Sequence, residues 1–114
     1  MATNSYETGR QSEDWAVDYL TGLGWTIVAR NFRGRRGEID VIARDGRALV
    51  FLEIKGSLRQ PRVEAVLPRQ ILRVRGAAEE FMVRNRLSLE SEVRFDALFV
   101  WGPPYQVTHL RDAF

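Results

Sequence analysis

The stretch Gly37-Glu-Ile-Asp-Val-Ile-Ala-Arg-Asp-Gly-Arg-Ala-Leu-Val-Phe-Leu-Glu-Ile-Lys55 decides the fold. Two runs rich in Val, Ile, Leu and Phe flank Asp45-Gly46, and Asp-Gly between such runs is one of the strongest short-range signals for a hairpin. A two-residue loop at Asp45-Gly46 pairs Arg44 with Arg47. The sequence therefore predicts an antiparallel β-hairpin over residues 37–55.

Charged side chains gather on one face of this predicted hairpin. Its register sets Asp40 opposite Phe51 and Glu38 opposite Glu53. Side chains alternate between faces and opposed residues share a face, so these three acids and Lys55 project from the same side. Asp40 is then diagonal to Glu53, at roughly 7–8 Å between backbone positions. The other face is predicted to be core surface, formed by Ile39, Val41, Ala43, Leu52 and Ile54.

Three acids and a lysine beside apolar neighbours need a physical reason, because close carboxylates repel one another and burial adds to the cost. A divalent cation would supply it. Two carboxylates of this kind can hold Mg²⁺ while it keeps several waters, and the metal can activate a water as nucleophile. The alternative is a solvated sheet face with a cross-strand Lys–Glu pair. The hairpin residues alone leave both interpretations open.

Length and composition narrow the class of protein. A chain of 114 residues with 45% hydrophobic content is predicted to form one globular domain over residues 1–114. The absence of cysteine excludes disulfides and thiolate metal sites and agrees with a reducing compartment. The N-terminal segment Met1–Gly9 is polar, and no run approaches the roughly 18 apolar residues of a membrane helix. We expect a cytoplasmic protein.

The kind of basic residue says more than the net charge. A formal charge of +2, from 17 basic and 15 acidic residues, is too small by itself to imply nucleic acid. Sixteen of the 17 are arginine, and the only lysine is Lys55, beside the acidic cluster. Lysine is a compact charge with an adjustable pKa, whereas arginine is neither. This contrast supports a special role for Lys55.

The N-terminal part is predicted to form a helix and then a strand. Apolar residues recur at helical spacing over Ser12–Leu23, in a helix that could start nearer Tyr6, and Gly24 is the expected terminating residue. They are Trp15, Ala16, Tyr19, Leu20 and Leu23. Glu13 either interacts with the helix dipole or faces the hairpin. Trp25–Phe32 reads as a strand.

Two arginine-rich loops flank the hairpin in sequence. The basic loop, Arg33-Gly34-Arg35-Arg36-Gly37, leads into it, and its glycines allow a close backbone approach while its arginines could meet phosphate. A solvated basic turn is the equal alternative. After Lys55, the segment Gly56–Leu67 reads as an irregular loop. The arginines of this region that are candidates for phosphate contact are Arg33, Arg35, Arg36, Arg59, Arg62 and Arg69.

The C-terminal half completes a mixed sheet. Pro68 suits the first turn of a helix that runs to about Asn85. Its predicted buried stripe is Ile71, Val74, Ala78, Phe81 and Met82. Strands are predicted over Val93–Trp101 and Tyr105–Leu110, joined by Gly102-Pro-Pro. The order α-β-β-β-α-β-β predicts an α/β fold in which helices flank a mixed sheet.

Common catalytic motifs are missing from the chain. His109, the only histidine, has no predicted partner and reads as a packing or surface residue, so no Ser/His/Asp set can be assembled. No Gly-rich loop of the P-loop or dinucleotide type occurs. Enzymatic chemistry would therefore have to come from carboxylates and a metal.

Asp40, followed thirteen residues later by Glu53-Ile54-Lys55, resembles the PD-(D/E)XK nuclease superfamily and its restriction-endonuclease-like core. More closely, the chain resembles the YraN-like family of bacterial proteins, which is similar to Holliday-junction resolvases. The matching segments are spread over almost the whole length of the chain: Gly9-x-x-Ser-Glu13, Arg30-Asn31, Gly37-Glu-Ile-Asp-Val-Ile-Ala43, Val50-Phe-Leu-Glu-Ile-Lys55, Ala65-Val66, Arg94-Phe-Asp96 and Asp112-Ala-Phe114.

The resemblance implies a Mg²⁺- or Mn²⁺-dependent endonuclease that acts on branched or structured DNA, in DNA repair or recombination. Asp40 and Glu53 match the metal-binding acids, and Lys55 matches the motif lysine. Glu13 matches the acid of the first helix, and Glu38 a family position that would be an additional acid of the site. Junction resolvases act as symmetric pairs, so a homodimer is expected by analogy.

Two other interpretations remain open from the sequence. One is a non-catalytic nucleic-acid-binding protein that retains the nuclease fold, and the other is a protein-interaction module that uses the hairpin. The chain has Gly56-Ser57 where the family commonly has Thr-Arg, and Gln70-Ile71 where a Lys-Gln pair often opens the second helix. These departures weaken phosphate contacts near the expected site.

Overall fold

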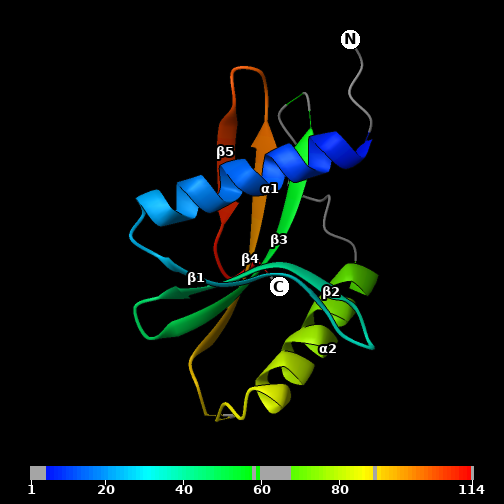
Figure 1. The fold of residues 1–114 in the computed structure, drawn as a ribbon, viewed down its shortest axis with the longest axis vertical. Helices are drawn as coiled ribbons and strands as arrows, with labels where there is room; N and C mark the ends of the chain where they lie inside the picture. The colour runs from blue at the N-terminus through cyan, green and yellow to red at the C-terminus, as the bar shows by residue number, and fades with distance from the viewer. Residues whose placement is uncertain (1–4, 58, 60–67, 89, 114) are drawn as a thin grey trace.

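Five strands form one mixed sheet that carries a helix on each face (Figure 1). The computed structural model describes residues 5–57, 59, 68–88 and 90–113, with the side chains of residues 11–57, 59, 70–88 and 90–113. The elements in chain order are α1 (Ser5–Gly22), β1 (Thr26–Arg33), β2 (Glu38–Asp45), β3 (Ala48–Ser57), α2 (Pro68–Arg84), β4 (Val93–Trp101) and β5 (Gln106–Leu110). This order confirms the predicted α/β class and is consistent with a restriction-endonuclease-like core.

The strands lie in the sheet in the order β1-β2-β3-β4-β5. The β3–β4 pair is parallel, with α2 as its crossover, and the other three pairs are antiparallel. The β2–β3 hairpin therefore occupies the middle of the sheet, where the stretches Val41–Arg44 and Leu49–Leu52 are paired on both edges. A partner cannot add a strand along these stretches, which weakens the interaction-module interpretation.

The hairpin forms as predicted, but its turn is centred one residue later. Asp45 pairs with Ala48, so the loop residues are Gly46 and Arg47 rather than Asp45 and Gly46. Gly46 has a φ of 59°, and a positive φ at the first loop residue is the geometry that type II′ turns give to glycine. Strand partners consequently shift by two residues, which keeps the side chains of the paired stretches, Val41–Asp45 and Ala48–Leu52, on their predicted faces.

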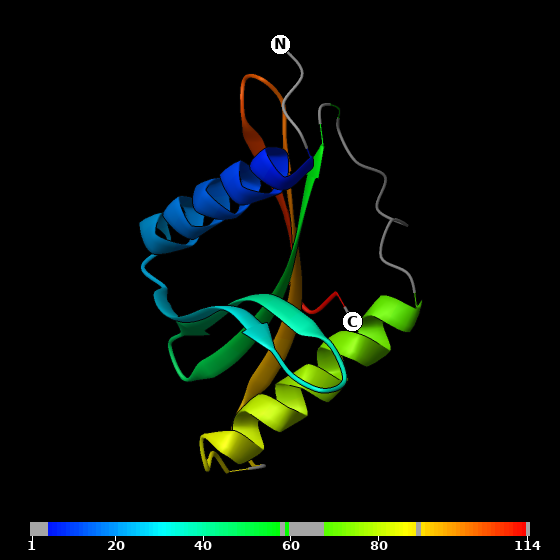
Figure 2. The same cartoon turned by 45° about the vertical axis from the view of Figure 1, so that its right-hand side comes forward.

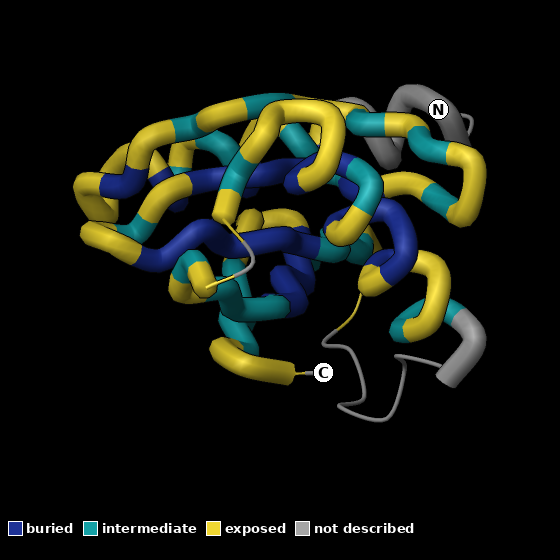
Figure 3. Tube along the Cα trace, turned by 90° about the horizontal axis from the view of Figure 1, so that it is seen from below, coloured by how far each residue is buried: buried dark blue, intermediate teal, exposed yellow. Residues whose placement is uncertain are grey.

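The core consists of two layers, one under each helix. Figure 2 shows the two helices on opposite sides of the sheet. The buried residues on the α1 side are Ala16, Leu20, Trp25, Val41, Ala43, Ala48, Val50, Leu52, Leu98 and Val100. Those on the α2 side are Ile39, Ile42, Leu49, Phe51, Val74, Ala77, Ala78, Phe81 and Met82. Figure 3 shows the buried segments running through the middle of the molecule. Neither helix has the length and apolar character needed to cross a membrane, within the described residues.

One predicted core residue lies on the opposite face. Ile39 was expected beside Val41, but it packs in the α2 layer. The paired register of β2 with β3 extends only as far as Val41, opposite Leu52. The alternation set by the hairpin therefore does not carry over to Ile39.

Helix α1 extends further toward the N-terminus than the periodic apolar residues, and not all of these residues are buried. It begins at Ser5 and ends at Gly22, and Gly24 follows with a φ of 88°, as expected for a terminating glycine. Trp15 and Leu23 belong to the apolar residues at helical spacing, but their side chains are 46% and 43% exposed. Trp15 instead stacks on Tyr105, with ring centroids 5.0 Å apart.

The end of β3 also extends beyond the prediction. Gly56 and Ser57 were assigned to a loop, but they continue the strand. Both pair with β4, as Gly56 with Val100 and Ser57 with Trp101. The parallel pairing with β4 thus continues past the end of the apolar run in the sequence.

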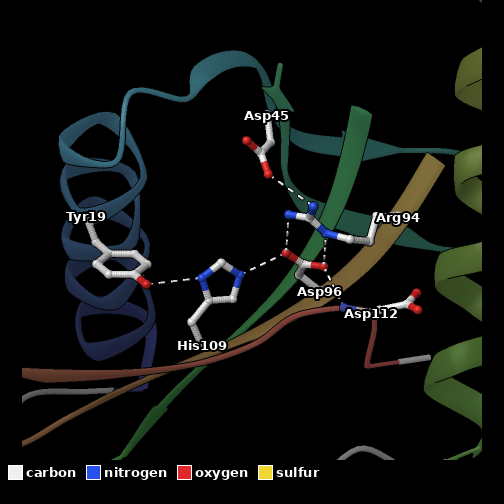
Figure 4. Close-up of polar contacts among 6 residues, drawn as sticks. All are labelled: Tyr19, Asp45, Arg94, Asp96, His109 and Asp112. Carbon is white, nitrogen blue, oxygen red and sulfur yellow. Dashed lines mark hydrogen bonds and ion pairs between the residues drawn. The ribbon is translucent and has the colours of Figure 1, made fainter. Parts of the chain in front are cut away.

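A buried carboxylate, Asp96 on β4, holds the C-terminal part of the chain to the sheet (Figure 4). Arg94 donates to both of its oxygens, at 2.9 Å from Nε and 3.0 Å from Nη2, and also donates to Asp45 at 3.0 Å. The Asp112 backbone N–H donates at 2.9 Å. Burial by itself raises the pKa of Asp96, but hydrogen bonds from His109, Arg94 and this N–H together lower it to about 2.

His109 has partners that the sequence did not reveal. Its Nε2 lies 2.8 Å from Asp96 Oδ2, and its Nδ1 lies 3.1 Å from the hydroxyl of Tyr19 (Figure 4). The ring is nearly buried and links α1, β4 and β5. None of these residues lines the pocket that contains the predicted acids, so the geometry gives His109 a structural role.

Candidate functional site

Asp40 lies where β2 stops pairing with β3. The last paired residues are Val41 and Leu52, and one position further on the Asp40 carboxylate replaces a backbone acceptor. Its Oδ2 accepts the backbone N–H of Ile54 at 2.7 Å. Since Ile54 stands between Glu53 and Lys55, this bond holds Asp40 next to both. The predicted grouping of the hairpin charges is thus present, through a contact that strand alternation alone does not predict.

Glu53 and Lys55 form an ion pair, with 3.6 Å between Lys55 Nζ and Glu53 Oε1. The Glu53 side chain is only 17% exposed. Burial, followed by the charge of Asp40, raises the pKa of Glu53 to about 7, although Lys55 acts in the opposite direction. Burial also raises the pKa of Asp40, against the lowering effects of the Ile54 N–H and Lys55. Two repelling, half-buried carboxylates are costly unless a cation joins them.

A pocket of about 520 Å³ opens over these acids. Its lining residues are Arg33, Gly34, Arg35, Arg36, Gly37, Glu38, Asp40, Glu53, Gln70, Arg73 and Val74. The structure therefore brings the basic loop, the hairpin acids and the start of α2 to one hollow. A hollow with carboxylates and several arginines suits a ligand that carries both phosphate and a metal.

Glu13 approaches the same acids from α1. Its Oε1 is buried and has no hydrogen-bond partner. Burial, followed by the charge of Asp40, raises the pKa of Glu13, while Arg30 and Asn31 lower it. Asn31 itself has a left-handed φ of 53°. Glu13 thus faces the hairpin, as one of the two sequence interpretations predicted.

The chemistry of these donors fits a hard divalent cation. All are carboxylate oxygens, and the unpartnered Oε1 of Glu13 is an acceptor that the protein leaves unsatisfied. Within the described residues, however, no three acidic or histidine side chains lie close enough together to form one metal-binding group. Mg²⁺ commonly takes one or two carboxylates and fills its remaining positions with water. Asp40 and Glu53 therefore fit as a two-carboxylate site, with Glu13 further out.

Glu38 lies at the mouth of the pocket. It pairs with Arg33 at 3.5 Å, and the two side chains are 62% and 80% exposed. Such an exposed pair contributes little to stability. A part for Glu38 in the site remains a prediction.

The structure describes the side chain of only one of the three remaining predicted arginines. Arg59 is exposed and does not line the pocket. Arg62 and the side chain of Arg69 fall outside the described residues. Gln70, which the sequence placed near the expected site, lines the pocket, and so does Arg73, which the sequence interpretation did not assign to the site. Their separation of three residues on one helix was the available signal, because it places them on neighbouring turns of one face.

Comparison with known proteins gives one consistent family. Residues 12–100 match the family described as "Uncharacterised protein family UPF0102". A UPF0102 protein of Chlorobium limicola is 37% identical over 127 aligned residues, which cover 100% of this chain and 96% of that protein. UPF0102 proteins of Frankia casuarinae and Rhodococcus jostii are 39% and 42% identical over 112 residues, with 93% of this chain and 94% of each relative covered. The chain therefore belongs to the UPF0102 family, the YraN-like group that its motifs resemble.

Proposed function

We propose that the protein binds nucleic acid and acts as a Mg²⁺-dependent endonuclease on branched or otherwise structured DNA. One observation carries this proposal. Asp40 and Glu53 are held together, with Lys55 3.6 Å from Glu53, at a hollow lined by four arginines. Two half-buried, repelling carboxylates cost free energy in a protein that uses neither of them, whereas a phosphodiester with a metal ion would offset both the carboxylate and the arginine charge.

Each residue of the site has a distinct task in this proposal. Asp40 and Glu53 would hold the cation, which would neutralise phosphate charge and activate a water. Arg33, Arg35, Arg36 and Arg73 line the hollow and would bind the flanking phosphates. Lys55 would stabilise the charge that develops on the phosphate during cleavage.

The metal site can be tested by calorimetric titration with Mg²⁺ and Mn²⁺. We expect wild-type protein to bind, and Asp40→Asn or Glu53→Gln to abolish binding. Asn retains an oxygen for the Ile54 N–H, so the fold should persist. Without metal, both variants should unfold at the same or a higher temperature than wild type, because each removes one of two repelling carboxylates. Undiminished binding by both variants would refute the ligand assignment.

Nucleic-acid binding can be tested through its salt dependence. Binding to a labelled four-way DNA junction should weaken steeply with salt, since arginine–phosphate contacts release counterions. Replacing Arg35 and Arg36 with Ala should lower the salt slope by up to about 2. The matched control is Arg44→Ala with Arg47→Ala, which removes the same charge from the exposed hairpin turn. Equal effects of the two pairs would show that the basic loop makes no specific contact.

A second candidate is nucleic-acid binding without hydrolysis. The observation in its favour is that Glu13, Asp40 and Glu53 do not form a three-ligand group in the described residues. The pocket arginines serve this function equally well. Cleavage, rather than binding, separates the two candidates.

A further inference from the structure

We propose that Glu80 is a positioning residue, which fixes the basic loop on α2 so that its arginines are presented to DNA. The inference deepens the proposed function and rests on it. It concerns an acid on the second helix that sequence patterns did not single out and that does not line the pocket over Asp40 and Glu53.

Both oxygens of the Glu80 carboxylate are engaged. Oε2 accepts the backbone N–H of Arg35 at 2.7 Å, and Oε1 accepts from Arg84 Nη2 at 2.7 Å. The side chain is 19% exposed, much less than a free surface glutamate. Because Glu80 holds the backbone of Arg35, it leaves the guanidinium available, and that group makes no ion pair with the described residues. Glu80 thus fixes the loop without neutralising its arginine directly.

Three glycines allow the loop to lie this close to α2. A Cβ on Gly34 would be 2.1 Å from Glu80 Oε2, and one on Gly37 would be 2.7 Å from the carbonyl oxygen of Arg73. On the helix, a Cβ on Gly76 would be 2.6 Å from Cδ of Arg36. Glycine inside a helix is unfavourable, so its presence under the arginine stem needs a packing reason. These contacts indicate a built docking surface between loop and helix.

The alternative is that Glu80 only adds negative charge near the DNA. The two hypotheses predict opposite changes in DNA affinity when Glu80 is removed. A nearby carboxylate repels phosphate, so its removal should strengthen binding if charge alone matters. If Glu80 orders the loop, removal should weaken binding, because DNA would then have to order the loop itself. The comparison of affinities is therefore decisive.

The experiment measures binding of the labelled four-way junction by Glu80→Ala, Glu80→Gln and Glu79→Ala. We expect Glu80→Ala to weaken binding about tenfold, the scale for ordering one or two long side chains. It should also lower the salt slope by up to about 2, as contacts of Arg35 and Arg36 are lost. Glu80→Gln keeps an oxygen for the Arg35 N–H and should restore near-wild-type affinity and slope. Glu79 pairs with Arg36 through exposed side chains at 3.3 Å, so Glu79→Ala should leave binding equal or tighter.

Thermal unfolding of each variant shows whether the fold is intact. If Glu80→Ala does not fold, the binding of Glu80→Gln still tests the proposal. Unchanged or tighter binding by Glu80→Ala would overturn the positioning role while wild-type binding still supported the proposed function. Weak binding by Glu80→Gln, in a folded protein, would also overturn it. If wild type binds no junction, flap or single-stranded DNA, the proposed function and this inference both fail.

Discussion

Replacing Lys55 with Ala is expected to slow DNA cleavage by about 10²–10³, the scale for losing one electrostatic stabiliser of a transition state. Lys55 Nζ is 3.6 Å from Glu53, and it is the only lysine in the chain. Metal binding should remain largely intact, since Asp40 and Glu53 retain their oxygens. DNA affinity should fall far less than the rate, because one of many cationic groups is lost. Single-turnover cleavage and calorimetric titration measure the two steps separately.

The matched control for Lys55 is Arg47→Ala. Arg47 is an exposed residue of the hairpin turn, at the opposite end of β3 from Lys55. Its removal lowers the net charge by the same amount. We expect this variant to cleave at a rate close to that of wild type. Equal cleavage rates for Lys55→Ala and Arg47→Ala would show that Lys55 has no specific role in cleavage.

Replacing Asp96 with Asn should cost about 3 kcal/mol of unfolding free energy, the lower end of the range for breaking a buried ion pair. The fully buried carboxylate accepts from Arg94 and His109, and the neutral amide leaves the Arg94 charge poorly compensated. Denaturant unfolding measures the loss. Asp45→Asn removes the other, more exposed partner of Arg94 and should cost less than about 1 kcal/mol. Similar costs for the two variants would contradict the assignment of Asp96 as the anchor.

The same carboxylate makes stability depend on pH. Its pKa is lowered from 3.8 to about 2, so its contribution is fully present above pH 3.8 and is lost as the pH falls through 2. The shift corresponds to about 2 kcal/mol. The difference in unfolding free energy between wild type and Asp96→Asn should therefore shrink over this interval. A difference that stays constant from neutral pH to pH 2 would show that Asp96 titrates normally.

The grouping of the site's acids could be predicted because the error in the position of the turn does not change which face of the sheet they occupy. Moving the loop from Asp45-Gly46 to Gly46-Arg47 shifts partners by two residues, so Asp40 and Glu53 keep their common face. A shift by one residue would have placed Asp40 and Glu53 on opposite faces of the sheet. The Asp40 hydrogen bond to Ile54 was not predictable, because it exists only where the backbone ladder ends.

Long-range contacts account for what the sequence did not show. The His109–Asp96 pair depends on the register of β4 with β5, which no local pattern specifies. Periodicity groups Trp15 with the apolar residues of the helix, but it does not show that this side chain is half-exposed and stacks on Tyr105. The only sign in the sequence that the basic loop packs closely on α2 is its glycines. Gly34 cannot be told from an ordinary turn glycine by sequence alone.

Metal-dependent cleavage is the most direct test of the proposed function. Wild-type protein should be incubated with four-way junction, flap and single-stranded DNA, each with Mg²⁺, with Mn²⁺ and with a chelator, beside Asp40→Asn prepared identically. The account predicts that wild type cuts at least one branched substrate only when metal is present and that Asp40→Asn binds the same DNA without cutting it. Cleavage that persists in Asp40→Asn would identify a contaminating nuclease. Binding by wild type with no cleavage of any substrate in either metal would contradict the catalytic claim and leave a nucleic-acid-binding protein.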